Sequence, residues 1–171
     1  MFRPYEADSR VIVLDDVSQF ADVRGFTGGV LCPYDPFSKD DEKAIKQALR
    51  AKMTWSKIST YIDEPEQDGL PPSVREAFNT ISCVKQNLID VHHKMMIVAN
   101  FIVDGGRMHE HNGVSINYPL SGKKGMEVET ADGRGVWHTP LRHIFAFDHT
   151  IRHRSYPGIS RFNPKISILS L

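Results

Sequence analysis

The sequence predicts a mixed α+β protein whose C-terminal half forms a jelly roll, that is, a double-stranded β-helix. Two observations support this fold class. From Met95 onward, short apolar runs alternate with turn residues at the spacing typical of an antiparallel sandwich or barrel. Before that point, helical patterns are mixed with short strand-like runs. We therefore expect a single domain, in which a mixed α/β supporting part (1–90) packs its helices on one side of a jelly-roll core (91–171).

The composition is that of a folded globular chain and narrows the possible functions. Of the 171 residues, 40% are hydrophobic and 25% are charged, which excludes disorder as the main state. The 21 basic residues balance the 21 acidic ones, so a protein held to nucleic acid by phosphate contacts is not expected. No uncharged apolar stretch is long enough to span a membrane. The two cysteines, Cys32 and Cys83, favour a reducing cytoplasm over a disulfide framework.

The first elements are expected in the following order. An apolar run at 11–14 ends at two aspartates, which indicates a strand that leads into a helix. Residues 26–37 carry two glycines and two prolines and are typical of a loop. Ser38, with Asp41 three residues later, forms a capping pattern that opens a helix over 40–52.

The rest of the supporting part contains one strand and one further helix. Residues 58–62 alternate apolar and polar side chains and predict a strand. The acidic segment 63–72 is typical of a loop. Ser73 and Glu76 form a second capping pattern, which predicts a short helix through Phe78.

The core strands follow from apolar runs that end at turn residues. Turns are expected at 104–106, 121–125 and 132–135, where glycines concentrate. The expected strands are 95–103, 114–118, 126–130, 143–147 and 165–170. Facing strands of a jelly roll can direct side chains into the mouth of the barrel, which is a natural place for a metal pocket.

All eight histidines lie between positions 92 and 153, which points to the C-terminal half for chemistry. His109 and His111 flank Glu110, and residues two apart in an extended strand face the same side. Both histidines therefore either ligate one metal or lie solvated at a loop edge, with Glu110 on the outer side. His153 is expected to begin a returning strand, which brings a distant ligand to the same pocket.

Two basic residues precede or open the last apolar strand, namely Arg161 and Lys165. Buried cations are rare unless they are paired. A small ligand's carboxylate would be a suitable partner, and the alternative is that both cations are exposed at the end of the strand.

The run Phe147-Asp148-His149-Thr150-Ile151-Arg152-His153, followed by a basic residue and an apolar last strand, resembles the closing motif of the 2-oxoglutarate/iron(II)-dependent oxygenases. The aspartyl/asparaginyl β-hydroxylase-like branch is the most similar, because there a phenylalanine–aspartate pair precedes the second iron-binding histidine. The run His111-Asn112-Gly113 also resembles that branch's first histidine, which is followed by a small residue and glycine. The resemblance covers residues 105–171.

This resemblance implies a set of site residues. His111 and His153 would bind iron, and Lys165, or else Arg161, would pair with the distal carboxylate of 2-oxoglutarate, with Asn117 as a further co-substrate contact. The carboxylate that most of the superfamily uses as a ligand is missing after either His109 or His111. Either two histidines and water bind the metal, or His109 is a third ligand. Imidazole ligands alone also suit zinc, copper or nickel.

The implied activity is hydroxylation of a C–H bond in a small molecule or in an amino-acid or peptide side chain, coupled to the decarboxylation of 2-oxoglutarate to succinate. Two alternatives remain open from the residues themselves. One is a cupin-like metalloprotein without 2-oxoglutarate, acting as an isomerase or dioxygenase. The other is a non-enzymatic jelly-roll domain that serves as an interaction or virion-associated module.

Overall fold

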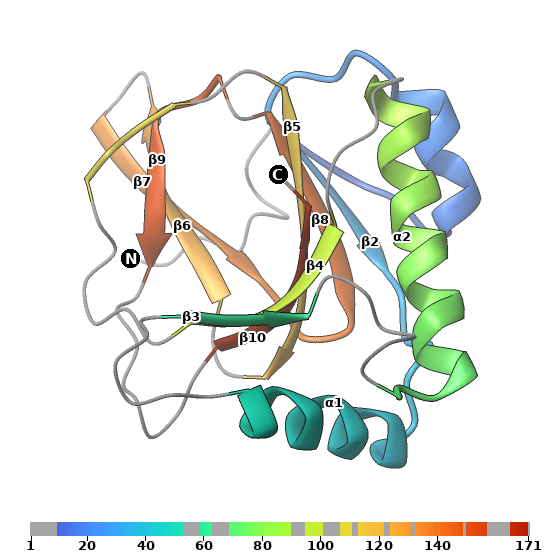
Figure 1. Ribbon diagram of the computed structural model, residues 1–171. Coiled ribbons are helices and arrows are strands. Elements are labelled where there is room, and N and C mark those ends of the chain that lie inside the picture. Colours follow the sequence, from blue (N-terminus) through green and yellow to red (C-terminus); the bar gives the residue numbers. More distant parts are fainter. Residues whose placement is uncertain are drawn as a thin grey trace.

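Ten strands in the described part of the chain form two sheets that face each other (Figure 1). The computed structural model describes residues 10–52, 59–62, 69–89, 95–100, 107–110, 113–121, 124–130, 133–148, 150–156 and 165–170. The strands are β1 (Val11–Val13), β2 (Gly29–Pro33), β3 (Ser59–Ile62), β4 (Met95–Asn100), β5 (Val114–Ser121), β6 (Lys124–Thr130), β7 (Gly133–Thr139), β8 (His143–Asp148), β9 (His153–Tyr156) and β10 (Lys165–Ser170). The helices are the 3-10 helix η2 (Val17–Val23) and the α-helices α1 (Lys39–Lys52) and α2 (Pro72–Ile89).

The strand order is that of a double-stranded β-helix. The large sheet runs β1-β2-β8-β5-β10-β4-β3, and the small sheet runs β7-β6-β9. Except for the parallel pair β1–β2, all the paired strands are antiparallel. Apart from the hairpin β6–β7, consecutive strands from β5 to β10 cross between the sheets, so segments distant in sequence become neighbours. The predicted α+β jelly roll is therefore confirmed, and strands from the first half extend its large sheet at both edges.

Side chains alternate between two faces of the large sheet, and both faces are buried on its strands β5 and β8. On β8, Ile144 and Ala146 pack with the helices, whereas Phe145 and Phe147 point toward the small sheet. The second group forms the barrel interior together with Met126, Val128 and Trp137. Fully burying an aromatic side chain of this kind contributes about 1.5–3 kcal/mol, so the two layers are firmly joined around the position where β9 begins.

The helices cover the other face of the large sheet, as the sequence predicted. Helix α2 runs beside η2 and contacts β5 (Figure 1). It buries a stripe at helical spacing that consists of Val74, Ala77, Ile81, Val84 and Leu88. Helix α1 buries Ile45 and Leu49. None of the described helices is long and apolar enough to cross a lipid bilayer.

Four local predictions were wrong. The turn expected at 121–125 is shorter, because β5 extends to Ser121 and β6 begins at Lys124. Two of the other three differences arise because tertiary packing overrides a local signal. Residues 29–33 form β2 although a loop was expected, because the absence of a side chain at Gly29 admits the ring of Phe145, to which a Cβ would lie only 2.7 Å away. Helix α2 continues past Phe78 to Ile89, since its buried stripe continues. The glycine-rich segment expected to turn at 132–135 instead contributes the start of β7.

Asp41 joins the beginnings of the two α-helices. Its carboxylate accepts hydrogen bonds from the backbone and hydroxyl of Ser38, and Ser38 in turn accepts from the Asp41 backbone, as the capping pattern predicted. The hydroxyl of Ser73, at the start of α2, donates to the other carboxylate oxygen. The hydrogen bond from Ser73 contributes most to lowering the pKa of the Asp41 carboxyl below its ordinary value, and the bonds from Ser38 add to it against the opposing effect of burial.

Replacing Asp41 with alanine is expected to lower the free energy of unfolding by about 1–2 kcal/mol at pH 7, because a helix cap and the link to α2 are lost. The folded-state pKa of Asp41 is depressed. Its contribution is therefore complete above the unfolded-state pKa of about 3.9 and is lost as the pH falls through the lower folded value. Urea unfolding at pH 7 and pH 3 measures both effects.

The matched control is Asp40→Ala, which removes an exposed carboxylate from the same helical turn. It should change stability by less than about 0.5 kcal/mol. If both variants lost the same free energy of unfolding, Asp41 would act only through its negative charge in the first turn of the helix, and not through its hydrogen bonds.

Candidate metal site

The barrel brings together two histidines that are remote in sequence. His109 and His153 form an isolated antiparallel bridge, in which each backbone N–H donates to the other residue's carbonyl at 3.0 and 2.8 Å. The bridge extends the small sheet beyond β9, where residues 107–110 lie alongside the start of that strand. His153 is buried, with 5% of its surface exposed, whereas His109 is exposed. The pair thus extends from the barrel interior to its surface.

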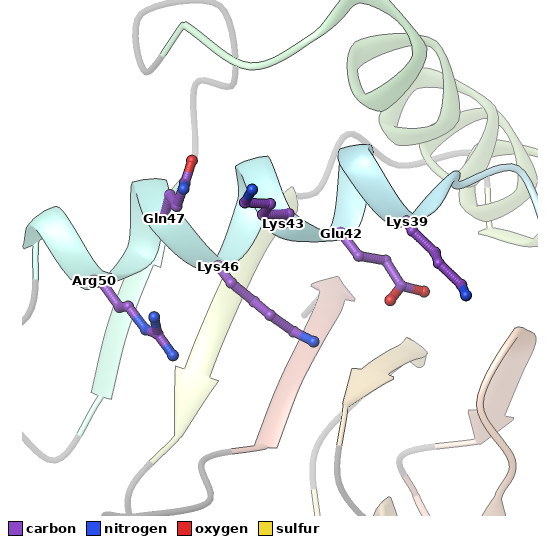
Figure 2. A pocket seen from close by; sticks show the side chains of 6 residues that line it. All are labelled: Lys39, Glu42, Lys43, Lys46, Gln47 and Arg50. Carbon is purple, nitrogen blue, oxygen red and sulfur yellow. The ribbon is translucent and has the colours of Figure 1, made fainter.

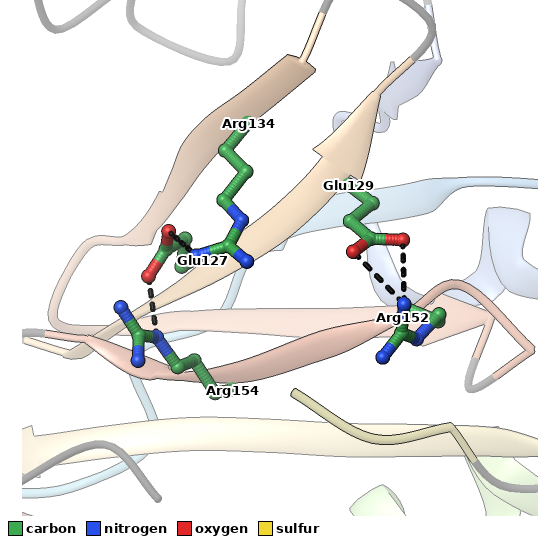
Figure 3. A network of polar contacts seen from close by, with 5 residues as sticks. All are labelled: Glu127, Glu129, Arg134, Arg152 and Arg154. Carbon is green, nitrogen blue, oxygen red and sulfur yellow. Dashed lines mark hydrogen bonds and ion pairs between the residues drawn. The ribbon is translucent and has the colours of Figure 1, made fainter. Parts of the chain in front are cut away.

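Alternation along β9 directs His153 inward. The flanking residues Arg152 and Arg154 lie on the outer face, where they pair with Glu129 and Glu127 of β6 (Figure 3). Hydrogen bonding from Arg154 is the main reason why the pKa of Glu127 is lowered. His153, between the two arginines, faces the opposite side and packs in the interior opposite Val128.

A tight turn between β8 and β9 returns the chain to this position. The Asp148 carboxylate accepts from the backbone N–H and the hydroxyl of Thr150 at 2.9 and 2.7 Å. The backbone N–H of Ile151 donates to the Asp148 carbonyl, and the Asp148 N–H donates to the Gly28 carbonyl. Asp148 is therefore a turn-forming residue, and its place before His153 fixes where β9 starts.

The two imidazole rings lie close together, and a backbone carbonyl orients each of them. Their centres lie 4.6 Å apart, with an angle of 57° between their planes. The Nδ1 atom of His153 lies 2.6 Å from the Ile151 carbonyl oxygen, and that of His109 lies 2.7 Å from the Arg107 carbonyl oxygen. A carbonyl only accepts, so each Nδ1 carries the proton and donates. In the neutral rings, Nε2 then holds the lone pair, which is the form that binds metals.

The interior beside His153 is aromatic. The His153 ring packs edge-to-face against Phe147 at 4.7 Å between centres and an interplanar angle of 85°. Phe147 stacks parallel to Phe145 at 6.4 Å, and Phe145 packs against the buried Trp137. These contacts hold the His153 ring from a second side and surround it with apolar surface.

Asn117 is a buried polar side chain in the same interior. On β5, its neighbours Ile116 and Tyr118 belong to the helix-side core, so Asn117 faces the barrel. The backbone register places it opposite Phe145 of β8 on one side and Leu169 of β10 on the other. It is 4% exposed, and its Oδ1 atom has no hydrogen-bond partner among the described residues. A buried amide oxygen without a partner costs about 1–3 kcal/mol, which points to a ligand at this place.

The other predicted site residues are only partly covered by the structure. His111 and Arg161 lie outside the described residues, so their roles stay predictions. Lys165 opens β10, where its backbone pairs with Asn100. Among the described residues, no third histidine, cysteine, aspartate or glutamate joins His109 and His153 in a cluster that could hold a metal.

The two described histidines fit a metal in donor chemistry and spacing. Metal–imidazole bonds of about 2.1 Å require two rings that share one cation to lie this close, and the exposed side of His109 leaves access for further ligands. The sequence suggested the residue types, but it could not show the Arg107 and Ile151 carbonyls or the contact with Phe147. The only feature of the sequence that could have indicated these hydrogen bonds is spacing, since each accepting carbonyl belongs to the residue two positions before its histidine.

No protein-family profile and no curated protein matches this sequence. Solved structures do match. The non-heme alpha-ketoglutarate-dependent epimerase SnoN from nogalamycin biosynthesis has a TM-score of 0.59 at 11% identity, covering 90% of this chain and 81% of its own. A Pseudomonas putida prolyl-4-hydroxylase has a TM-score of 0.57 at 11% identity, with 89% and 97% covered.

A third similar structure is an oxidoreductase of the 2OG-Fe(II) oxygenase family from Burkholderia pseudomallei. Its TM-score is 0.57 at 12% identity, and the alignment covers 93% of this chain and 92% of that one. At such low identity, these likenesses concern the fold. The chain therefore shares the double-stranded β-helix fold of 2-oxoglutarate/Fe(II) oxygenases.

Substitution of His109 or His153 with alanine is expected to weaken Mn(II) binding by about 100-fold or more, because each removes a direct metal contact. Isothermal titration calorimetry on protein prepared without a histidine tag measures the affinity. His109 is exposed, so its truncation should leave thermal stability nearly unchanged.

His143→Ala is the matched control. The Nδ1 atom of His143 also lies near a carbonyl two residues earlier, that of Leu141 at 3.0 Å, but this histidine stands at the start of β8 without a partner imidazole in the described structure. Its removal, like that of His138, should leave Mn(II) affinity unchanged. Normal binding by both the His109 and the His153 variants would contradict the site.

Proposed function

We propose that this protein is a non-haem Fe(II)- and 2-oxoglutarate-dependent oxygenase that hydroxylates a small molecule or an amino-acid side chain. The observation that carries the proposal is the bridged pair His109–His153, whose two Nδ1 atoms donate to backbone carbonyls. The pair lies inside a fold shared with oxygenases of this kind, and its Nδ1–H hydrogen bonds leave both Nε2 atoms for a metal.

The metal would be held by His109 and His153, and we assign the third protein position to His111. The sequence argument for His111 is that residues two apart in an extended segment face the same side, as expected for His109 and His111. Bound Fe(II) would supply activation of O2 for C–H hydroxylation. The protein's own contribution is to keep both rings in the metal-binding tautomer and to surround His153 with the apolar surface of Phe147.

The co-substrate would lie in the barrel interior beside Asn117. The unpartnered Oδ1 marks one end of an amide that can present its N–H groups to a carboxylate after rotation about the side chain's last bond. Lys165, four residues before the register partner of Asn117 on β10, would pair with the distal carboxylate, with Arg161 as the alternative. A charged pair excluded from water both binds and orients such a diacid.

The aspartyl/asparaginyl β-hydroxylase-like branch remains our more specific assignment. The support comes from the phenylalanine–aspartate pair typical of that branch. Phe147 packs on the His153 ring, and Asp148 forms the turn before His153. The substrate itself is not fixed by the fold, since the similar structures include an epimerase and a prolyl hydroxylase.

The enzyme is expected to release succinate only when both Fe(II) and 2-oxoglutarate are present, and Lys165→Ala should raise the KM for 2-oxoglutarate at least tenfold. Loss of a desolvated charged hydrogen bond costs about 1.5–3 kcal/mol, which corresponds to that change. Succinate assays over a range of 2-oxoglutarate concentrations give the KM.

Lys165→Arg, which keeps the charge, should restore most of the affinity, and Lys52→Ala on helix α1 should behave like the unmodified protein. An unchanged KM in Lys165→Ala would remove Lys165 from this role. Metal binding without any 2-oxoglutarate turnover would favour the cupin-like alternative.

Asn117→Leu separates ligand binding from folding. Removal of a buried amide with an unpartnered oxygen should raise the free energy of unfolding by about 1 kcal/mol. The same change should abolish most of the thermal stabilisation that 2-oxoglutarate gives in the presence of Mn(II). Differential scanning fluorimetry with and without 2-oxoglutarate measures both, and a destabilised variant would identify Asn117 as a structural residue instead.

A further inference from the structure

Helix α1 carries a row of cations along its exposed face. Lys39, Lys43, Lys46 and Arg50 are separated by four, three and four residues. At about 100° per residue, all four fall within an arc of roughly 60°, and the row is about 16 Å long. Figure 2 shows these side chains spread over the helix together with Glu42 and Gln47. The six residues line a shallow depression of about 270 Å³.

The four cations of this basic row have no acidic partner in the described part of the chain. The small sheet differs: there Arg134, Arg152 and Arg154 all pair with Glu127 or Glu129 (Figure 3). The basic row does the opposite, since four cations stand beside one carboxylate, that of Glu42. Like charges three or four residues apart on a helix repel each other, so an anion bound along the row would relieve a repulsion that the protein otherwise carries.

We propose that the basic row of α1 is a docking surface for the phosphate backbone of a nucleic acid. The shape of the patch favours a linear polyanion, because four cations spaced along about 16 Å of the helix can contact successive phosphates of one strand. A small anion would contact only part of it. A membrane surface is disfavoured because the apolar residues Ile45 and Leu49 point into the core and leave the exposed face without an apolar anchor.

The neutral net charge of the chain is compatible with this surface. Net charge averages over the whole molecule, whereas phosphate contacts depend on the local row. The proposed contacts go to phosphates, which carry no sequence information, so binding should be independent of sequence. The inference does not depend on the oxygenase proposal, because it concerns a different element and requires no metal.

Fluorescence anisotropy with a labelled 20-bp duplex and with an oligo(dT) strand, at 50–200 mM KCl, tests the proposal. Four phosphate contacts predict a slope of log K against log salt of about −3.6 for the duplex and about −2.8 for the single strand. Lys43→Gln should reduce the magnitude of the duplex slope by about 0.9, and the double variant Lys43→Gln/Lys46→Gln by about 1.8.

Lys52→Gln is the matched control, because it removes the same charge from the same helix but outside the arc. It should keep the slope of the unmodified protein, and circular dichroism should show unchanged helix content in all variants. The proposal is overturned if no binding is seen below about 100 μM at 50 mM KCl, or if Lys52→Gln and Lys43→Gln weaken binding equally. Binding to phosphatidylserine vesicles but not to either oligonucleotide would also overturn it, in favour of a membrane surface.

Discussion

The candidate site depends on one backbone interaction, the pair of hydrogen bonds between His109 and His153. Forty-four positions separate these residues, and no local preference brings them together. The bridge forms because β9 is paired with β6, while its other edge is free to receive residues 107–110. Once the two backbones are in register, the side chains of directly opposed residues lie on the same side and within contact distance. The proximity of the two rings is thus a consequence of sheet closure.

Local sequence patterns predicted those elements whose stability is also local. The Ser38–Asp41 capping box, the apolar run of β8 and the terminal strand β10 appear at the expected positions, because capping and alternation act within a few residues. The failures have the opposite origin. Gly29 looks like a loop residue, yet the ring of Phe145 requires a glycine there within a strand. For α2, the capping pattern predicted a helix only through Phe78, but the buried Ile81 and Leu88 continue its apolar stripe and the helix extends to Ile89.

For the site, the sequence predicted residue types better than their pairing. Alternation places His109 and His111 on one side of an extended segment, but it cannot show which of them lies opposite His153. That choice is made by the register between two remote segments, and the register assigns the position to His109. The hydrogen bonds at Nδ1 were equally hidden, because they go to backbone carbonyls, which every residue has. The resemblance to a known motif identified His153 as a candidate ligand, and the backbone pairing identified His109 as the residue opposite it.

The distribution of charged side chains differs between the barrel, which holds the candidate metal site, and the exposed face of helix α1. On the small sheet, charge is kept outside and paired, as with Arg152 and Arg154 on either side of His153, while the inner face of β9 presents the His153 imidazole to the ring of Phe147. Such an apolar interior favours uncharged metal ligands. A charged co-substrate would need an opposite charge on the protein for each of its own. The only described helix face with four cations in line belongs to α1, whose inner side is fixed by Ile45 and Leu49. A surface built in this way could change its ligand without altering the candidate site, because α1 packs on β3, whereas His109 and His153 lie at the small sheet.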